Sequence, residues 1–422
     1  DEGSHLVRVF RGSLPGSTVP VYFLDHPHYE GAGDIYYQDV TNAAEQHVLQ
    51  VERFLFFCAA ALRLLPELGW QPDILHAHDW HAALAPWLAH SKGADAHLRS
   101  MASVYTIHNL ALQGGVGAAR FRELIAPIVD DGSLGTKAGG TVNITKVGLR
   151  AVDMITTVSP SYAREILQPE FGCGLDGVLR ERRQRLVGIL NGIDTSTFDP
   201  AHDALIQRRY SANRLGDKTT NTLALKKALG ITNPGPVFGF ISRLTEQKGV
   251  ELICTIIPEL VHLGCGVVVL GAGEPALEAR MTAQARRFPN AVSARIGFDV
   301  HLAQRIYAGS DFFLMPSKYE PCGLGQMIAM RYGTIPIVRA VGGLRDTVQE
   351  SPHGNGFVFE EYSAAALAAA CHRALDAFHN GAEWSALQRR AMRQDFSWNT
   401  SAAAYEHVYA LAQHHHAEKR AS

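Results

Sequence analysis

Residues 237–275 read VFGFISRLTEQKGVELICTIIPELVHLGCGVVVLGAGEP and contain the structural unit that the rest of the chain repeats. Two short apolar runs, Val237–Ile241 and Gly266–Leu270, have the continuous hydrophobicity of strands buried on both faces. Between them, about Gly249–Leu263 has the length and the apolar spacing of a helix. Strands and helices that alternate in this way predict an α/β fold, in which helices cover both faces of a parallel sheet.

The same alternation extends in both directions along the chain. The further predicted strands are His5–Arg11, Val19–Asp25, Asp73–His78, Ala102–His108, Met154–Val158, Leu186–Asn191, Ala291–Arg295, Phe312–Met315 and Ile335–Arg339. The longer predicted helices in the first half are about Asn42–Leu68, Trp80–His90 and Asn143–Val152.

A polar, irregular segment, residues 199–222, is predicted to be an interdomain linker. We therefore expect two doubly wound domains, residues 1–200 and 201–399, that face each other across a cleft. A helix at about residues 400–415 should pack back onto the first domain. Ligands of such folds bind at the carboxyl ends of strands, so functional residues should directly follow strands.

Composition excludes several classes of protein. The 422 residues suffice for two or three domains with buried cores. With 39 Lys and Arg against 41 Asp and Glu, the formal net charge is −2, which argues against a basic nucleic-acid binder or a polybasic membrane binder. The longest clean apolar run, Phe54–Leu62, is far too short to span a bilayer. Six cysteines without a CxxC pair favour free thiols in a reducing cytosol, so we expect a cytoplasmic protein.

Two motifs follow predicted strands in the first half. His76-Ala-His78-Asp79-Trp80-His81 gathers histidines, but Trp80 separates Asp79 from the last histidine, which disfavours a metal site. Asp79 is expected either to contact a polar ligand, with Trp80 as a flat apolar platform, or to cap the next helix. A sugar suits this pair, because it offers an apolar face and hydroxyl groups that need acceptors. His108, in Thr106-Ile107-His108-Asn109, has a structural and a functional interpretation, and both remain open.

Three motifs in the second half indicate a phosphate-linked sugar. Arg243 and Lys248 lie in a loop between a strand and a helix and can converge on one anion, although two solvated cations would give the same pattern. Glu320 leads into a glycine-rich turn, Cys322-Gly323-Leu324-Gly325, that opens a helix and exposes backbone N–H groups. Gly342-Gly343-Leu344 repeats the strand–glycine–helix design, whereas Gly271-Ala-Gly273 alone is a weak signal.

With these motifs the chain resembles the bacterial glycogen synthase and plant starch synthase family. The matching segments keep the family's order and span about residues 20–400: HAHDWHA (76–82), TIHNLALQG (106–114), ILNGID (189–194), SRLTEQKG (242–249), GAGEP (271–275), SKYEPCGLGQM (317–327) and VGGLRDTV (341–348). The resemblance implies the GT-B fold, with two Rossmann-like domains. It also implies transfer of glucose from ADP-glucose to the nonreducing 4-hydroxyl of an α-1,4-glucan, with retention of configuration.

The resemblance implies a role for individual residues. Arg243 and Lys248 would neutralise the departing diphosphate, Glu320 would stabilise positive charge on the donor sugar, and His108 would contact the donor glucose. The other implied donor-binding residues are Asn191, Phe298 (stacked on the base), Cys322, Gly323, Leu324, Gly325, Gly342, Gly343 and Leu344. The implied acceptor-side residues are Asp79, Trp80 and Tyr36. The partners would be a nucleotide sugar and an α-1,4-glucan, with no metal, no other cofactor, no nucleic acid and no membrane.

The chain departs from the family pattern in two places. Gly325 stands where many relatives carry a hydroxyl residue, and no Lys-x-Gly-Gly-Leu loop precedes residue 20. Because the chain also begins at Asp1 rather than Met, we expect an N-terminally truncated first domain. The alternatives are therefore a non-catalytic or inactive glucan-binding fragment, or another retaining GT-B glycosyltransferase. Ile328, where related transferases carry a second Glu, argues against the latter. For the reaction we favour front-face attack, because no second carboxylate is evident as a nucleophile.

Overall fold

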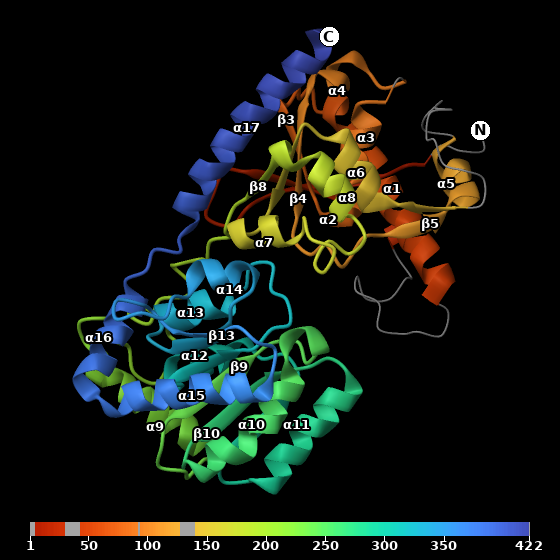
Figure 1. The fold of residues 1–422 in the computed structure, drawn as a ribbon. Coiled ribbons are helices and arrows are strands. Elements are labelled where there is room, and N and C mark those ends of the chain that lie inside the picture. Colours follow the sequence, from red (N-terminus) through yellow and green to blue (C-terminus); the bar gives the residue numbers. More distant parts are fainter. Residues whose placement is uncertain (1–4, 30–42, 92, 127–139, 422) are drawn as a thin grey trace. The chain divides into compact units, whose positions relative to one another are not determined.

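The computed structural model describes residues 5–29, 43–91, 93–126 and 140–421 (Figure 1). Contacts within the chain divide it into two compact units. Unit 1 comprises Asp1–Thr157, Ile166–Val187 and Tyr405–Ser422, and unit 2 comprises Val158–Glu165 and Gly188–Ala404. The chain therefore enters unit 2 first for a short segment at Val158–Glu165 and again for its main part.

A six-stranded parallel sheet with the order β11-β10-β9-β12-β13-β14 forms the centre of unit 2. Its strands are β9 (Val237–Ile241), β10 (Gly266–Gly271), β11 (Val292–Ile296), β12 (Phe312–Met315), β13 (Ile335–Arg339) and β14 (Phe357–Phe359). The chain builds one side of the sheet from β9 to β11 and then returns beside β9 with β12. The loops after β9 and β12 therefore separate at a topological switch point, where open α/β sheets bind their ligands.

Helices cover both faces of this sheet. They are α9 (Lys218–Leu229), α10 (Val250–His262), α11 (Pro275–Arg287), α12 (Val300–Gly309), α13 (Gly325–Arg331), α14 (Gly342–Thr347), α15 (Ala364–His379) and α16 (Gly381–Met392). Along β10, Val267 and Val269 join the large core cluster that contains α10, whereas Val268 and Leu270 join a smaller cluster with α9 and α12. Alternate side chains thus point to opposite, equally covered faces, which explains the unbroken apolar runs in the sequence.

The sheet of unit 1 has the order β3-β4-β7-β8, with β3, β4 and β7 parallel. These strands are β3 (Ile74–His78), β4 (Ala102–Ile107), β7 (Met154–Thr157) and β8 (Leu186–Gly188). Two small antiparallel pairs accompany them: β1 (Arg8–Ser13) with β2 (Pro20–Asp25), and β5 (Gly115–Gly117) with β6 (Thr141–Asn143). The helices are α1 (Ala43–Glu67), α2 (Asp79–Ala82), α3 (Leu84–Ala89), α4 (Ala96–Ser100), α5 (Ala118–Ile125), α6 (Ile144–Ala151) and α8 (Asp176–Glu181).

The last helix, α17 (Trp398–Ala421), belongs to unit 1 from Tyr405 onward. The fully buried carboxylate of Asp153 binds this helix to the rest of unit 1. Asp153 Oδ1 accepts a hydrogen bond from Lys419 Nζ at 2.8 Å, and Oδ2 lies 3.1 Å from His416 Nδ1. The backbone N–H of Ser103 donates to the same carboxylate at 2.9 Å. One buried charge is thereby matched by groups from the sheet and from the helix.

The predicted linker, residues 199–222, is instead packed into unit 2, and α9 begins inside it at Lys218. Tyr210 is buried and donates from its hydroxyl to the carbonyl oxygen of Tyr332 at 2.7 Å. Asp203 is buried and accepts from the Tyr332 hydroxyl at 2.7 Å. The polar residues that suggested exposure are therefore satisfied by partners more than a hundred positions away in the sequence.

Two local predictions also differ from the structure. The predicted helix Trp80–His90 is divided into α2 and α3 at Ala83, where α6 approaches so closely that a Cβ on Gly148 would lie 2.8 Å from the Ala83 Cβ. The predicted strand Leu186–Asn191 ends at Gly188, where the backbone packs so closely against Ser159 that an added Cβ would lie 2.2 Å from the Ser159 carbonyl oxygen.

Candidate active site

The switch point of unit 2 brings together the loops that follow β9 and β12. The first loop ends at Gly249, whose φ is +69° and where a Cβ would lie 2.2 Å from the carbonyl oxygen of Pro316. Only glycine allows this approach without strain. The backbone N–H of Lys318 then donates to the carbonyl oxygen of Gln247 at 2.8 Å. Glycine and this hydrogen bond therefore hold the two loops against each other.

Lys248 and Glu320 form an ion pair across these loops. Lys248 Nζ lies 2.8 Å from Glu320 Oε1 and 2.6 Å from Oε2, and Ser317 Oγ donates to Oε2 at 2.9 Å. The lysine side chain is 15% exposed and the glutamate side chain 6% exposed. Little water reaches the pair, so its mutual attraction is weakly screened. The site thus presents a fixed cation and a fixed carboxylate side by side at the end of the sheet.

Arg243 lies on the same loop as Lys248 but is exposed. Among the described residues its guanidinium has no hydrogen-bonding or ion-pair partner. The backbone carbonyl of Arg243, in contrast, accepts a hydrogen bond from the Thr245 N–H. On the facing loop, Gly323 has a φ of +73°, and no acceptor in the described part of the chain receives the N–H groups of Gly323 and Leu324. A free guanidinium and open N–H groups are donors that suit phosphate or sugar oxygens.

Gly342, Gly343 and Leu344 have a different place from the one expected. The Gly342 N–H donates to Glu165 Oε1 at 2.8 Å, the Gly343 N–H to the Glu320 carbonyl at 3.1 Å, and the Leu344 N–H to the Val341 carbonyl at 3.0 Å. These three N–H groups already donate to acceptors within the protein, so they are not open to oxygens of a nucleotide-sugar substrate. The glycines are required because a Cβ at Gly342 would lie 1.9 Å from the Glu320 carbonyl oxygen.

Gly271 and Gly273 are explained in the same way. A Cβ on Gly271 would lie 1.9 Å from the Ser242 carbonyl oxygen, and one on Gly273 would lie 2.4 Å from the Leu244 carbonyl oxygen. The Gly273 N–H donates to Glu278 Oε1 at 2.7 Å. This glycine pair supports the loop that carries Arg243, rather than cradling a phosphate itself.

The remaining predicted residues of unit 2 lie around the same edge of the sheet. Cys322 is buried next to the backbone of Asn191, and burial raises the pKa of its thiol to about 12. Gly325 begins α13, and a Cβ there would lie 2.9 Å from Phe313 Cε1, so the site has little room for a larger residue. Phe298 lies just after β11 and is 94% exposed, which leaves its ring open for stacking.

In unit 1 the predicted residues gather at the ends of β3 and β4. Asp79 Oδ1 accepts the backbone N–H of His108 at 2.7 Å, and Asp79 itself has a φ of +57°. His78 Nδ1 lies 3.0 Å from His108 Nε2. Burial, followed by the charge of His108, lowers the pKa of His78. Asp79 thus positions His108 by bridging two strand ends, and the N-cap of α2 is His78.

Trp80 and His76 are internal to unit 1. Trp80 is 8% exposed and packs edge-on against Phe54. Gly114 lies so close to its ring that an added Cβ would be 2.4 Å from Trp80 Cε3. Its ring is therefore not an open platform, in contrast to the expectation. His76 Nε2 lies 2.6 Å from Thr106 Oγ1, and burial lowers the pKa of His76 to about 3. Tyr36 lies outside the described residues.

Three groups of side chains in the described part of the chain have ligand atoms close enough for a metal ion. They are His5 with His26 and His28, His90 with Asp153 and His416, and His414 with His415 and Glu418. None contains a predicted site residue. In the second group, Asp153 and His416 are hydrogen-bonded to each other, as described for α17, and His90 Nε2 lies 2.9 Å from the Met101 carbonyl oxygen. No helix of the described residues combines the length and the apolar character needed to cross a membrane.

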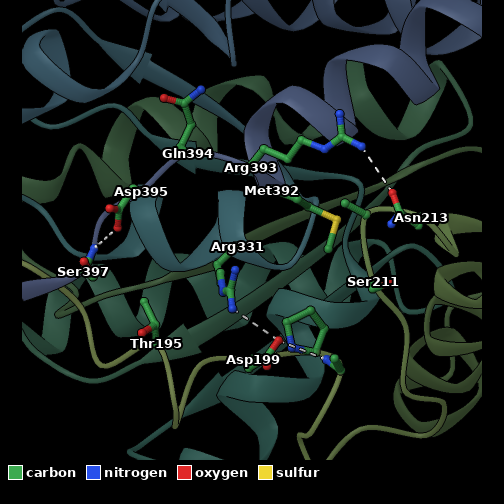
Figure 2. A pocket seen from close by; sticks show the side chains of 13 residues that line it. Thr195, Asp199, Ser211, Asn213, Arg331, Met392, Arg393, Gln394, Asp395 and Ser397 are labelled. Atoms are coloured by element: carbon green, nitrogen blue, oxygen red, sulfur yellow. Dashed lines mark hydrogen bonds and ion pairs between the residues drawn. The ribbon is translucent and has the colours of Figure 1, made fainter.

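A separate cavity of about 610 Å³ lies in unit 2 (Figure 2). It contains none of the predicted site residues. Arg331, the last residue of α13, lies near Asp199 at 3.4 Å, and Arg393 Nη2 donates to Asn213 Oδ1 at 3.2 Å. Because α13 runs from the carboxyl edge of the sheet toward the amino edge of β13, Arg331 marks this cavity as lying away from the switch point.

Ser317 is a residue of the candidate site that the sequence did not point to. Its hydroxyl is buried and holds one oxygen of Glu320. The only signal in the sequence was a serine three positions before a glutamate at the end of a strand. The segment Val158–Glu165, which hydrogen-bonds to the loops of the site, carried no signal of this role in the sequence.

Comparisons with known proteins agree with this arrangement. The family model "Starch synthase catalytic domain" matches residues 3–181, and "Glycosyl transferases group 1" matches residues 221–384. The catalytic domain of starch synthase IV from Arabidopsis thaliana superposes with a TM-score of 0.86 at 33% identity, covering 98% of this chain and 86% of that one. Sucrose-phosphate synthase from Thermosynechococcus elongatus shares the fold, with a TM-score of 0.57 at 18% identity over 90% of this chain and 81% of that one. Two α/β units with this site define a GT-B glycosyltransferase.

Two curated glycogen synthases give the narrower assignment. That of Desulforudis audaxviator is 44% identical over 421 residues, which cover 96% of this chain and 80% of the relative. That of Cellvibrio japonicus is 45% identical over 410 residues, which cover 94% and 83%. The chain belongs to the glycogen and starch synthase family and has a glycogen/starch synthase function.

Proposed function

We propose that this glycosyltransferase takes glucose from ADP-glucose and adds it, with retention of configuration, to the nonreducing 4-hydroxyl of an α-1,4-glucan. The observation that carries the proposal is the largely buried Lys248–Glu320 pair at the switch point, with the exposed Arg243 on the same loop as Lys248. A departing diphosphate needs fixed cations and N–H donors, and a sugar that gains positive charge needs a nearby carboxylate. Both requirements are met within two adjacent loops.

Each group has a proposed part in the reaction. Lys248 and Arg243 balance the negative charge that grows on the leaving phosphate, and the open N–H groups of Gly323 and Leu324 bind its oxygens or the sugar hydroxyls. Glu320 faces the anomeric carbon and stabilises its positive charge. The acceptor attacks from the face that the phosphate leaves, and the phosphate takes its proton. Cations and N–H donors supply the electrostatic stabilisation, so the proposal includes no metal and no other cofactor.

The choice of substrates rests on two further supports. The starch synthase IV structure is described as bound to ADP and acarbose, which supports an adenine nucleotide as one ligand. The exposed ring of Phe298 offers a stacking surface for a base. We assign His108 to the donor glucose and Asp79 to the acceptor side, where it also orders the His108 backbone.

Incubation with labelled ADP-glucose or UDP-glucose and glycogen tests the proposal. We expect incorporation from ADP-glucose, unchanged by EDTA, and a loss of more than 10²-fold in kcat for Glu320→Ala. No incorporation from either donor, with glycogen binding retained, would sink the proposal. Faster transfer from UDP-glucose would overturn the donor assignment alone. An effect of Glu320→Ala below threefold would refute the role of that carboxylate.

A further inference from the structure

The segment Val158–Glu165, VSPSYARE, is the part of the chain that enters unit 2 for only eight residues between two stretches of unit 1. It contains the short helix α7 (Pro160–Glu165), which packs against α14 in unit 2. The segment supplies no group that we assign to substrate. Its polar side chains nevertheless reach the two loops that surround Glu320, and we refer to Ser159–Glu165 as the 159–165 clamp.

The first contact of the clamp is with the residue that follows Glu320. Ser159 is fully buried, and its hydroxyl donates to the carbonyl oxygen of Pro321 at 2.6 Å. The same hydroxyl accepts the backbone N–H of Tyr162 at 3.1 Å, so its position is set by α7 itself. A short, buried hydrogen bond between two such fixed groups restrains the Pro321 backbone.

Two further contacts of the clamp are with α14. In the first of them, Asp346 of α14 accepts from both the backbone N–H and the hydroxyl of Ser161, each at 2.7 Å. At the other end of α7, Glu165 Oε1 accepts the backbone N–H of Gly342 at 2.8 Å. The clamp therefore holds α14 near both of its ends.

The held end of α14 touches Glu320 directly. The Gly343 N–H donates to the Glu320 carbonyl oxygen at 3.1 Å, and a Cβ on Gly342 would lie 1.9 Å from that same oxygen. A Cβ on Gly343 would lie 2.1 Å from the Cys322 carbonyl oxygen. The two backbones are thus hydrogen-bonded and packed too closely for a side chain to fit between them, so a shift of Gly342 and Gly343 is expected to move the backbone of Glu320.

We propose that the 159–165 clamp positions Glu320 for the transfer reaction, through Pro321 on one side and through Gly342 and Gly343 on the other. The inference rests on the role of Glu320 given under the proposed function. Its physical basis is that a carboxylate stabilises a transition state only where its oxygens lie at the right place, and a displacement of about 1 Å costs about 10²-fold in rate. Ser159, Ser161, Glu165 and Asp346 are thus positioning residues and do not touch the reacting atoms.

Four variants of the full chain test the inference. Ser159→Ala removes the hydrogen bond to Pro321, and Glu165→Leu removes the acceptor for Gly342. Glu165→Gln keeps an acceptor oxygen at nearly the same place and removes only the charge. Ser91→Ala is the matched control, because Ser91 is also a buried serine whose hydroxyl donates to a backbone carbonyl, at 2.9 Å, but it lies in unit 1.

We expect Ser159→Ala and Glu165→Leu each to lower kcat at least tenfold while the donor KM changes less than threefold, with thermal unfolding showing that both proteins are folded at the assay temperature. Glu165→Gln should retain at least half of the wild-type kcat, and Ser91→Ala should match wild type. The inference is overturned if the two disruptive variants keep kcat within twofold, or if Glu165→Gln is as damaged as Glu165→Leu.

Glu320→Ala, assayed in parallel, separates this inference from the proposed function. If Glu320→Ala is inactive and the clamp variants are unaffected, only the positioning role of the clamp is refuted. If Glu320→Ala retains activity, the proposed role of Glu320 is refuted, and the positioning role of the clamp is refuted with it.

Discussion

Replacement of Lys248 by methionine should destabilise unit 2 by leaving the carboxylate of Glu320 without its cation. The two side chains are 15% and 6% exposed, so water cannot take over the role of the lysine. Removal of one partner from a buried ion pair costs about 3–5 kcal/mol. Because Ser317 still donates to Glu320, we expect the lower end, about 3 kcal/mol. For a domain of this size the melting temperature should fall by roughly 6–12 °C.

A double-mutant cycle measures the pair itself. We expect Lys248→Met together with Glu320→Gln to be more stable than Lys248→Met alone, because the second change removes the uncompensated charge. Unfolding in urea, followed for all four proteins of the cycle at one pH, gives the coupling free energy between the two side chains. The reasoning is refuted if the single and double changes simply add.

The Lys318–Glu246 pair provides a matched control on the same two loops. Its Nζ–Oε1 distance is also 2.6 Å, but the side chains are 52% and 66% exposed. Water screens such a pair, so Lys318→Met should unfold within experimental error of wild type. An equal loss of stability for both lysine variants would show that burial is not the cause.

Three further changes test other parts of the structure. Burial lowers the pKa of Lys218 to about 7, so between about pH 7 and pH 10.5 the unfolded chain binds more protons than the folded chain. In urea unfolding, the stability of wild type relative to Lys218→Met should therefore rise as the pH rises from 7 to 10. A difference that stays constant over this range would contradict the prediction. Iodoacetamide at pH 8 should label the exposed Cys173 well before Cys322, whose thiol is buried with a pKa of about 12, and mass spectrometry of the two peptides decides the order. Asp153→Ala should cost roughly 1–3 kcal/mol and speed amide exchange in α17, since the buried Ser103 N–H and His416 lose their acceptor. Protection equal to wild type would rule out this anchor.

Much of the fold followed from local patterns. The strands of unit 2 are recognisable because helices cover both faces of the sheet, so each strand must be apolar at every position, as in Val267–Leu270. The long helix α1 and the strands β1 and β2 were predicted for similar local reasons, namely the spacing of their apolar residues. Local signals suffice where a residue's surroundings are set by its own element.

Local patterns failed where the partners are distant. Residues 199–222 are polar in sequence, but Asp203 and Tyr210 are buried because Tyr332 offers them hydrogen bonds. The glycines at 342 and 343 suggested a phosphate-binding turn, since a glycine pair indicates close approach without saying to what. The structure shows that the approach is to the backbone around Glu320. Trp80 was expected to be an open platform because a motif does not reveal whether its ring is covered.

The sequence by itself determined that there are two α/β halves and that the residues of interest follow strands, and it named Lys248 and Glu320 as candidates for the site. Only the tertiary structure decided that these two side chains form one buried pair. They are 72 positions apart, and they meet because β12 returns to lie beside β9. The periodicity of a strand depends on what covers its faces, whereas its place in the sheet depends on which edges pair. That choice is made by the packing of the whole unit, and it also brings the 159–165 clamp to the loops around Glu320.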